Sequence, residues 1–225
     1  MQGEYMLADT VMTILEIIGT IAFAISGAFI AISVKMDIFG VVFIGCITAF
    51  GGGIVRDLLI GRIPPAVFQK FELVIIAAVA AVAVFVIAAL NKKTFNPLRA
   101  KIENINNVFD AMGLAAFAVM GTEVAFSEGF SDNPFLSVIL GMLTGVGGGI
   151  IRDILTDSTP VVFKKYVYAI AAIAGSILYY ILRINTDNPV WPTILAMVLV
   201  FMLRMLATKY RWSLPKINFE ENKEK

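Results

Sequence analysis

Residues 16–31 read EIIGTIAFAISGAFIA, and residues 110–125 read DAMGLAAFAVMGTEVA. The two segments share an acidic first residue, two glycines, an Ala-Phe-Ala run and a final alanine at identical spacing. A second pair follows downstream, GCITAFGGGIVRD at residues 45–57 and GMLTGVGGGIIRD at residues 141–153. Self-similarity held in register over both pairs indicates that the chain contains an internal repeat.

The repeated segments lie in a strongly apolar chain. Of its 225 residues, 59% are hydrophobic and 16% are charged, against about 45–50% and about 25% in soluble domains. The mean hydropathy is +0.85. A bilayer core needs about 20 apolar residues per helix, which predicts an all-α polytopic membrane protein with seven transmembrane helices. The predicted spans are 12–34, 38–60, 70–90, 106–126, 134–156, 166–184 and 190–208.

The repeat and the span count together predict the topology. Residues 12–90 form the first three-helix repeat and residues 106–184 form the second. Because three is odd, the second repeat enters the membrane from the opposite side, as in inverted-repeat transporters and channels. We expect one transmembrane domain over residues 1–208, a seventh helix without a counterpart, and a polar cytoplasmic tail over residues 209–225.

Basic residues are distributed unevenly between the two sides of this predicted topology. One side carries three, Arg62, Lys70 and Arg183. The other side carries twelve: Lys35, Lys92, Lys93, Arg99, Lys101, Lys164, Lys165, Lys209, Arg211, Lys216, Lys223 and Lys225. Cytoplasmic loops carry the excess of Lys and Arg, so we expect the C-terminus in the cytoplasm and the N-terminus outside.

Two glycine triplets lie inside predicted membrane helices, Gly51-Gly52-Gly53 and Gly147-Gly148-Gly149. Each glycine costs about 1 kcal/mol relative to alanine in a helix interior. One hypothesis is that both helices kink or unwind there and present backbone carbonyls to a cation. The alternative is close helix packing through small residues spaced four apart.

Ionisable residues inside membrane spans usually mark a pathway or an ion pair. The inverted topology places Glu16 at the depth of Arg56, toward the outside. It places Asp110 at the depth of Arg152, toward the cytoplasm. We therefore expect each arginine to pair with that carboxylate on a neighbouring helix, and we expect Arg204 to reach the membrane interface. The other carboxylates inside the spans are Asp57, Asp153 and Glu123.

Several function classes fit the sequence poorly. The chain has no histidine, and its one cysteine, Cys46, has no evident base partner, so we expect neither an enzyme nor a metal site. The formal net charge is +1, and no basic cluster interleaved with aromatic residues suggests a nucleic-acid partner. We expect no cofactor, and the lipid bilayer as the main partner.

The paired Gly-Gly-Gly-x-x-Arg-Asp motifs at 51–57 and 147–153 resemble those of the TRIC family, the trimeric intracellular cation channels, in its prokaryotic branch. The resemblance extends over nearly the whole chain. It implies a homotrimer in a prokaryotic plasma membrane, with a pathway for potassium and other monovalent cations inside each subunit. In animal members a Lys-Glu-Val triplet contributes to voltage and lipid response; the matching residues here are Thr122-Glu123-Val124, without the lysine.

Two functions therefore remain open from the sequence. The first is a monovalent cation channel lined at the glycine triplets and at the ionisable residues named above, with bound lipid as a further possibility. The second is a secondary transporter of a small zwitterion such as glycine, because bacterial relatives of the TRIC family also carry a glycine-transporter label. An inverted repeat with interrupted helices fits both.

Overall fold

The computed structural model describes residues 2–90, 99–164 and 167–212, and these parts of the chain consist of helices and their connections. The first half contains α1 (Gln2–Ser33), α2 (Ile38–Leu59), the short 3-10 helix η1 (Ala66–Gln69) and α3 (Phe71–Leu90). The second half contains α5 (Arg99–Ser127), α6 (Pro134–Leu155), the short α7 (Val161–Lys164), α8 (Val167–Arg183) and α9 (Val190–Lys209).

The repeat is visible in how the equivalent helices begin. The Asp37 side chain accepts a hydrogen bond from the Gly40 N–H at 2.8 Å and caps α2. The Asn133 side chain accepts one from the Leu136 N–H at 3.0 Å and caps α6, whose first residue is Pro134. Both caps satisfy backbone donors that a helix start leaves unpaired. Similar local signals therefore start the second helix of each repeat.

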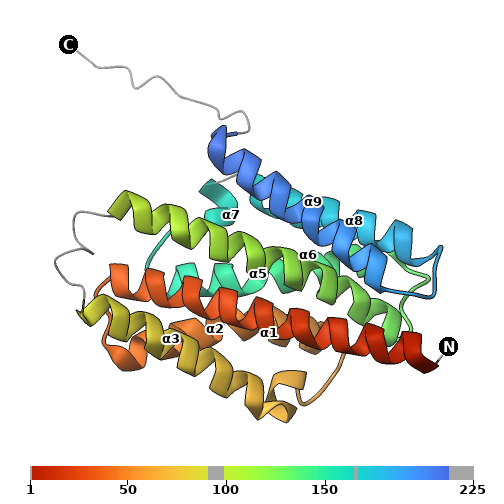
Figure 1. Cartoon of the computed structure of the whole chain (residues 1–225), viewed down its shortest axis with the longest axis horizontal. Helices are drawn as coiled ribbons and strands as arrows, with labels where there is room; N and C mark the ends of the chain where they lie inside the picture. The colour runs from red at the N-terminus through yellow and green to blue at the C-terminus, as the bar shows by residue number, and fades with distance from the viewer. Residues whose placement is uncertain (1, 91–98, 165–166, 213–225) are drawn as a thin grey trace, which may run out of the picture.

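The two repeats pack face to face and run in opposite directions (Figure 1). Helix α1 runs from the N-terminus on the right of the view toward the left, and α5 runs beside it from left to right. Across the repeat interface α1 packs against α5 and α2 packs against α6. Helix α3 covers α1 and α2, while α8 covers α5 and α6. Helix α9 has no counterpart and packs against α8 and α5.

The predicted spans agree with the helices, with two differences in length. Six helices are long and apolar enough to cross a membrane, and α8 is a shorter apolar helix of 17 residues. Helices α1 and α5 begin about ten and seven residues before the predicted spans, at Gln2 and Arg99, because helices can continue beyond the bilayer into water. Most of the predicted tail, residues 213–225, lies outside the described residues.

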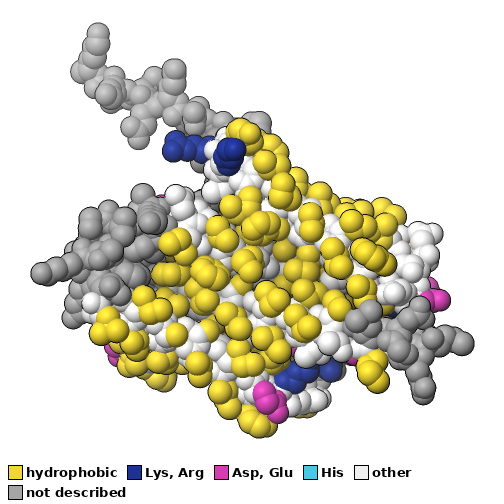
Figure 2. Space-filling model, in the orientation of Figure 1, with side chains coloured by type: hydrophobic (Ala, Val, Ile, Leu, Met, Phe, Trp, Pro, Cys, Tyr) yellow, Lys and Arg dark blue, Asp and Glu magenta, His cyan; other side chains and the backbone are white. Residues whose placement is uncertain are grey.

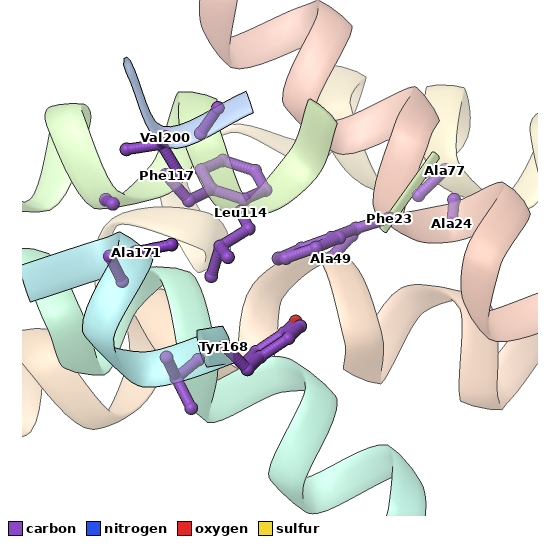
Figure 3. Packing of buried hydrophobic residues seen from close by; sticks show 13 residues of the cluster. Phe23, Ala24, Ala49, Ala77, Leu114, Phe117, Tyr168, Ala171 and Val200 are labelled. Atoms are coloured by element: carbon purple, nitrogen blue, oxygen red, sulfur yellow. The ribbon is translucent and has the colours of Figure 1, made fainter. Parts of the chain in front are cut away.

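Two equivalent phenylalanines meet near the centre of the interface. Phe23 of α1 and Phe117 of α5 belong to the two Ala-Phe-Ala runs, and their ring centroids are 5.3 Å apart. Both rings are buried in the main apolar cluster, close to Leu114 and Ala49 (Figure 3). The outer surface is also apolar: hydrophobic side chains cover most of the visible face over the helices (Figure 2). This distribution fits a molecule surrounded by lipid.

Candidate functional site

The glycine triplets lie where α2 crosses α6. A Cβ atom at Gly52 would overlap the Thr144 carbonyl oxygen, and one at Gly148 would overlap the Thr48 carbonyl oxygen. Both helices are continuous through their triplets, so the backbone carbonyls there make the helix's own hydrogen bonds. Of the hypothesis that the helices kink or unwind here, the unwinding is therefore wrong, and the kink stays a prediction. The close-packing interpretation accounts for Gly52 and Gly148, since only glycine lets two backbones approach this closely.

An open cavity of about 360 Å³ lies at the end of the molecule that the sequence predicts to face outside. Three carboxylates and three cations line it: Asp9, Glu16, Glu123, Arg56, Arg62 and Lys70. A smaller cavity of about 50 Å³ shares Glu16 and Arg56 with it and extends to Gly53, Thr144 and Phe117. We call these two spaces together the outer vestibule. Its smaller part reaches Phe117 of the central aromatic pair.

Glu16 and Arg56 of the outer vestibule belong to two separate ion pairs. The Lys70 ammonium lies 2.6 Å from a Glu16 carboxylate oxygen. The Arg56 guanidinium donates to Oδ1 of Asp57, from Nε at 2.9 Å and from Nη2 at 2.8 Å. The predicted Glu16–Arg56 pair is therefore wrong. Lys70 reaches Glu16 from the connection before α3, and the long arginine side chain folds back onto its neighbour in sequence.

At the opposite end of the interface, Arg152 is almost completely buried, with 1% of its side chain exposed. Its Nη1 lies 3.1 Å from Oδ1 of Asp110 on α5, which confirms the predicted pair. The same Nη1 donates to the Ser26 hydroxyl of α1 at 3.0 Å. Its Nε donates to Oδ1 of Asp153 at 2.8 Å. One arginine thus ties α1, α5 and α6 together.

Arg204 of α9 joins the same group, which overturns the prediction that it reaches the interface. Its side chain is 2% exposed, and Nη2 lies 3.8 Å from Oδ2 of Asp110. The guanidinium carbon lies 4.6 Å from the centroid of the Tyr168 ring, within the range of a cation–π interaction. We call Asp110, Arg152, Asp153 and Arg204 the inner charge cluster. Its buried charges require partners, and the four side chains supply them to one another.

The two aspartates of the Arg-Asp motifs have equivalent structural roles. Oδ2 of Asp57 accepts a hydrogen bond from the Ala66 N–H at 2.8 Å, at the start of η1. Oδ2 of Asp153 accepts one from the Val161 N–H at 2.8 Å, at the start of α7. Each aspartate therefore binds its preceding arginine through one oxygen and caps the next short helix through the other. Both oxygens of each aspartate therefore take part in structural hydrogen bonds.

Glu123 is placed differently from the other predicted site residues. It lines the outer vestibule from α5. One of its oxygens accepts a hydrogen bond from the Tyr179 hydroxyl at 2.6 Å and lies 3.2 Å from Nε of Arg183. Both partners are on α8. The carboxylate therefore links α8 to α5 beside the outer vestibule.

Four residues near these charges were not predicted from the sequence to belong to the site. Lys70 and Arg204 are the cations described above, and Tyr168 supplies the aromatic face. Thr20 lines the inner part of the vestibule, and its buried hydroxyl finds no hydrogen-bond partner among the described residues. A depth argument within the repeats could not find Arg204, because α9 lies outside the repeats. Thr20 breaks the repeat, since Leu114 stands at the equivalent position.

The fold and the buried charges define a class: an integral membrane protein made of two inverted three-helix repeats and one additional helix. The family model described as "Glycine transporter" matches residues 13–89 and again residues 107–183, one match for each repeat. The chain belongs to this family. It is 37% identical to the membrane protein YvgT of Bacillus subtilis, over 92% of this chain and 96% of the relative. It is 32% identical to the inner membrane protein YadS of Escherichia coli, over 92% and 97%.

Solved structures of similar proteins have the same fold. One, a prokaryotic TRIC channel crystallised in 0.5 M KCl, is 34% identical and has a TM-score of 0.81 over 91% of this chain and 99% of its own. A second, from a study of conductance through TRIC cation channels, is 37% identical with a TM-score of 0.79, over 92% and 98%. The TRIC orthologue from Rhodobacter sphaeroides is 28% identical with a TM-score of 0.80, over 90% and 100%.

Proposed function

We propose that this protein is a potassium-permeable monovalent cation channel whose pathway runs between α1, α2, α5 and α6. The observation that carries the proposal is the line of polar features along this interface. The outer vestibule opens at one end, and the inner charge cluster lies at the other. Membrane proteins bury ionisable groups of this kind where they serve a permeation path. The similarity to TRIC cation channels at 34–37% identity supports the same function.

The site residues enter this proposal with distinct roles. Glu16, Arg56 and Glu123 line the outer entrance, and Gly53 lines the inner part of the vestibule. Arg152 and Asp110 border the inner end. Asp57 and Asp153 position the two arginines through their hydrogen bonds. Four glycines of the triplets bring α2 and α6 together: Gly51, Gly52, Gly147 and Gly148. Gly149 instead lies beside Tyr168 of α8 and Arg152.

The structure corresponds to a closed pathway in this proposal. The Phe23 and Phe117 rings pack against each other between the vestibule and the inner charge cluster. Two buried aromatic rings exclude water, and a hydrophobic constriction can close a pore to ions by dewetting. Conduction then requires these rings to separate. A path of this kind needs no cofactor.

The assembly and the orientation are part of the same proposal. The Rhodobacter sphaeroides relative is described as a trimeric channel, and we infer that this chain also forms a homotrimer. The excess of twelve basic residues over three supports a cytoplasmic C-terminus and an external N-terminus. We expect a prokaryotic plasma membrane to be its location.

The test is a single-channel recording of the purified protein in planar bilayers under a KCl gradient. We expect unitary currents that reverse near the potassium equilibrium potential, that persist when sodium replaces potassium, and that are unchanged when gluconate replaces chloride. Protein-free bilayers are the control. Uptake of labelled glycine into proteoliposomes without unitary currents would instead establish a transporter.

A further inference from the structure

Arg204 is a buried cation that comes from outside the repeats. It lies on α9, and only 2% of its side chain is exposed. Its Nη2 faces Asp110 at 3.8 Å and its guanidinium lies on the Tyr168 ring. Its Nε has no hydrogen-bond partner within the part of the chain that the structure describes. A buried arginine costs free energy unless partners neutralise its charge. Packing alone therefore gives no reason for an arginine at this position. Its charge therefore requires an explanation.

Counting charges in the inner charge cluster provides one. Arg152 and Arg204 carry two positive charges, and Asp110 and Asp153 carry two negative charges, so the cluster is neutral. Without Arg204, the cluster would consist of Arg152 and the two carboxylates, and it would carry one negative charge. Arg204 supplies the missing cation by approaching Oδ2 of Asp110, while Arg152 holds Oδ1.

At the outer end, the residues equivalent to Asp110, Arg152 and Asp153 reach a neutral balance in another way. Glu16, which is equivalent to Asp110, takes its cation from Lys70, in the connection that follows η1. Arg56 and Asp57 neutralise each other. Among the described residues, the second cation thus comes from the repeat itself at the outer end and from α9 at the inner end.

We propose that Arg204 is a positioning residue that holds Asp110 and sets the net charge at the inner end of the cation pathway, so that the seventh helix determines ion selectivity there. This proposal rests on the proposed channel function. A site in a low-dielectric surrounding with uncompensated charge concentrates ions of the opposite sign. With Arg204 present the inner charge cluster has no net charge, and without it the cluster would carry a negative charge that favours cations over anions.

The experiment is a charge cycle over Arg204 and Asp110, read as the ratio of potassium to chloride permeability from reversal potentials. Arg204→Gln leaves the cluster at −1, Asp110→Asn leaves it at +1, and the double variant is neutral again. We expect the ratio to rise by about tenfold in Arg204→Gln, at the lower end of electrostatic focusing effects. It should fall in Asp110→Asn and return to the wild-type value in the double variant. Arg204→Lys should also keep the wild-type ratio.

Lys209→Gln is the matched control, because it removes the same charge from the exposed end of the same helix, and it should leave the ratio unchanged. A purely structural role for Arg204 predicts a loss of melting temperature without an ordered change in selectivity. Conducting variants with equal ratios would therefore overturn this inference while leaving the channel function intact. If Arg204→Gln alone fails to fold, the comparison of Asp110→Asn with the double variant still decides the question. Absence of current in the wild type would instead contradict the proposed function.

Discussion

At the scale of single residues, the two motif arginines have unequal surroundings. Arg152 faces two carboxylates and a hydroxyl and is 1% exposed. Arg56 pairs with one carboxylate among the described residues, that of Asp57, and it is 10% exposed and lines the vestibule. The inverted repeat therefore carries the same residue into two different environments, and removing it should have two different effects.

We predict that Arg152→Ala destabilises the protein more than Arg56→Ala. Removing Arg152 leaves two buried carboxylates without their main partner, which costs about 3–5 kcal/mol. Removing Arg56 leaves a single carboxylate, that of Asp57, which keeps its hydrogen bond from Ala66 and borders the smaller cavity, so a lower cost of about 1–3 kcal/mol is expected. Thermal unfolding in detergent measures both, with exposed Lys209→Ala as the control. Equal melting temperatures for the two variants would contradict the conclusion that Arg152 links α1, α5 and α6.

The sequence predicted an ion pair correctly where depth in the membrane was enough to identify the partner. Asp110 meets Arg152 because the inversion brings α5 and α6 together at that depth. Glu16 does not meet Arg56, because a depth argument cannot account for Lys70 in a connection. The Arg-Asp contacts within each motif also escaped prediction. Adjacent residues do not face each other on a helix, but an arginine stem is long enough to bend back near a helix end.

At the scale of elements, the crossing of α2 and α6 depends on individual glycines of each triplet. A Cβ at Gly52 would collide with backbone, whereas a Cβ at Gly53 would meet only the end of the Arg56 side chain, at 3.6 Å. The triplet therefore contains both a position that requires glycine and one that tolerates a side chain.

We predict that Gly52→Ala destabilises the protein while Gly53→Ala does not. Forcing a methyl group against a carbonyl at a helix crossing costs about 1–3 kcal/mol. At Gly53 the gain in helix propensity, up to about 1 kcal/mol, has no such opposing clash. Unfolding temperatures of the two variants and the wild type measure the difference. If Gly52→Ala melts at the wild-type temperature, the crossing does not depend on this close approach.

The sequence predicted the positions of the helices well, but it predicted the backbone at the glycine triplets less well. Hydropathy and span length are sufficient for helix existence, because lipid accepts little else. Whether a glycine run breaks a helix depends on what crosses it, and that partner lies 96 residues away in the chain. The triplets therefore suggested unwinding from local propensity, while the tertiary contact favours a continuous helix.

At the scale of the whole molecule, orientation follows from the charge bias of the loops. We predict that a reporter fused after Lys225 is active in the cytoplasm and that one fused before Met1 is active outside. Paired alkaline phosphatase and green fluorescent protein fusions give opposite signals for the two locations. The reverse pattern would contradict the orientation and exchange the two ends of the proposed pathway.

Assembly is the second property at this scale. We predict that the purified protein runs as a trimer, with a mass of three chains of 24.4 kDa each. Native mass spectrometry from detergent measures this mass directly. A stable monomer that still conducts would show that each subunit carries a complete pathway. A dimer would contradict the proposed assembly.

The pairing of α1 with α5 and of α2 with α6 has a consequence for the history of the gene. Each of these helices meets its own counterpart, so the interface is of the self-complementary kind found between identical subunits. An ancestral gene for a single three-helix unit could therefore have encoded two copies inserted in opposite directions that dimerised through this surface. Fusion of duplicated genes would then fix one direction for each half. After fusion the two halves are encoded separately, so they can diverge. Two such differences are the replacement of Thr20 by Leu114 at the equivalent position and the addition of α9 with Arg204.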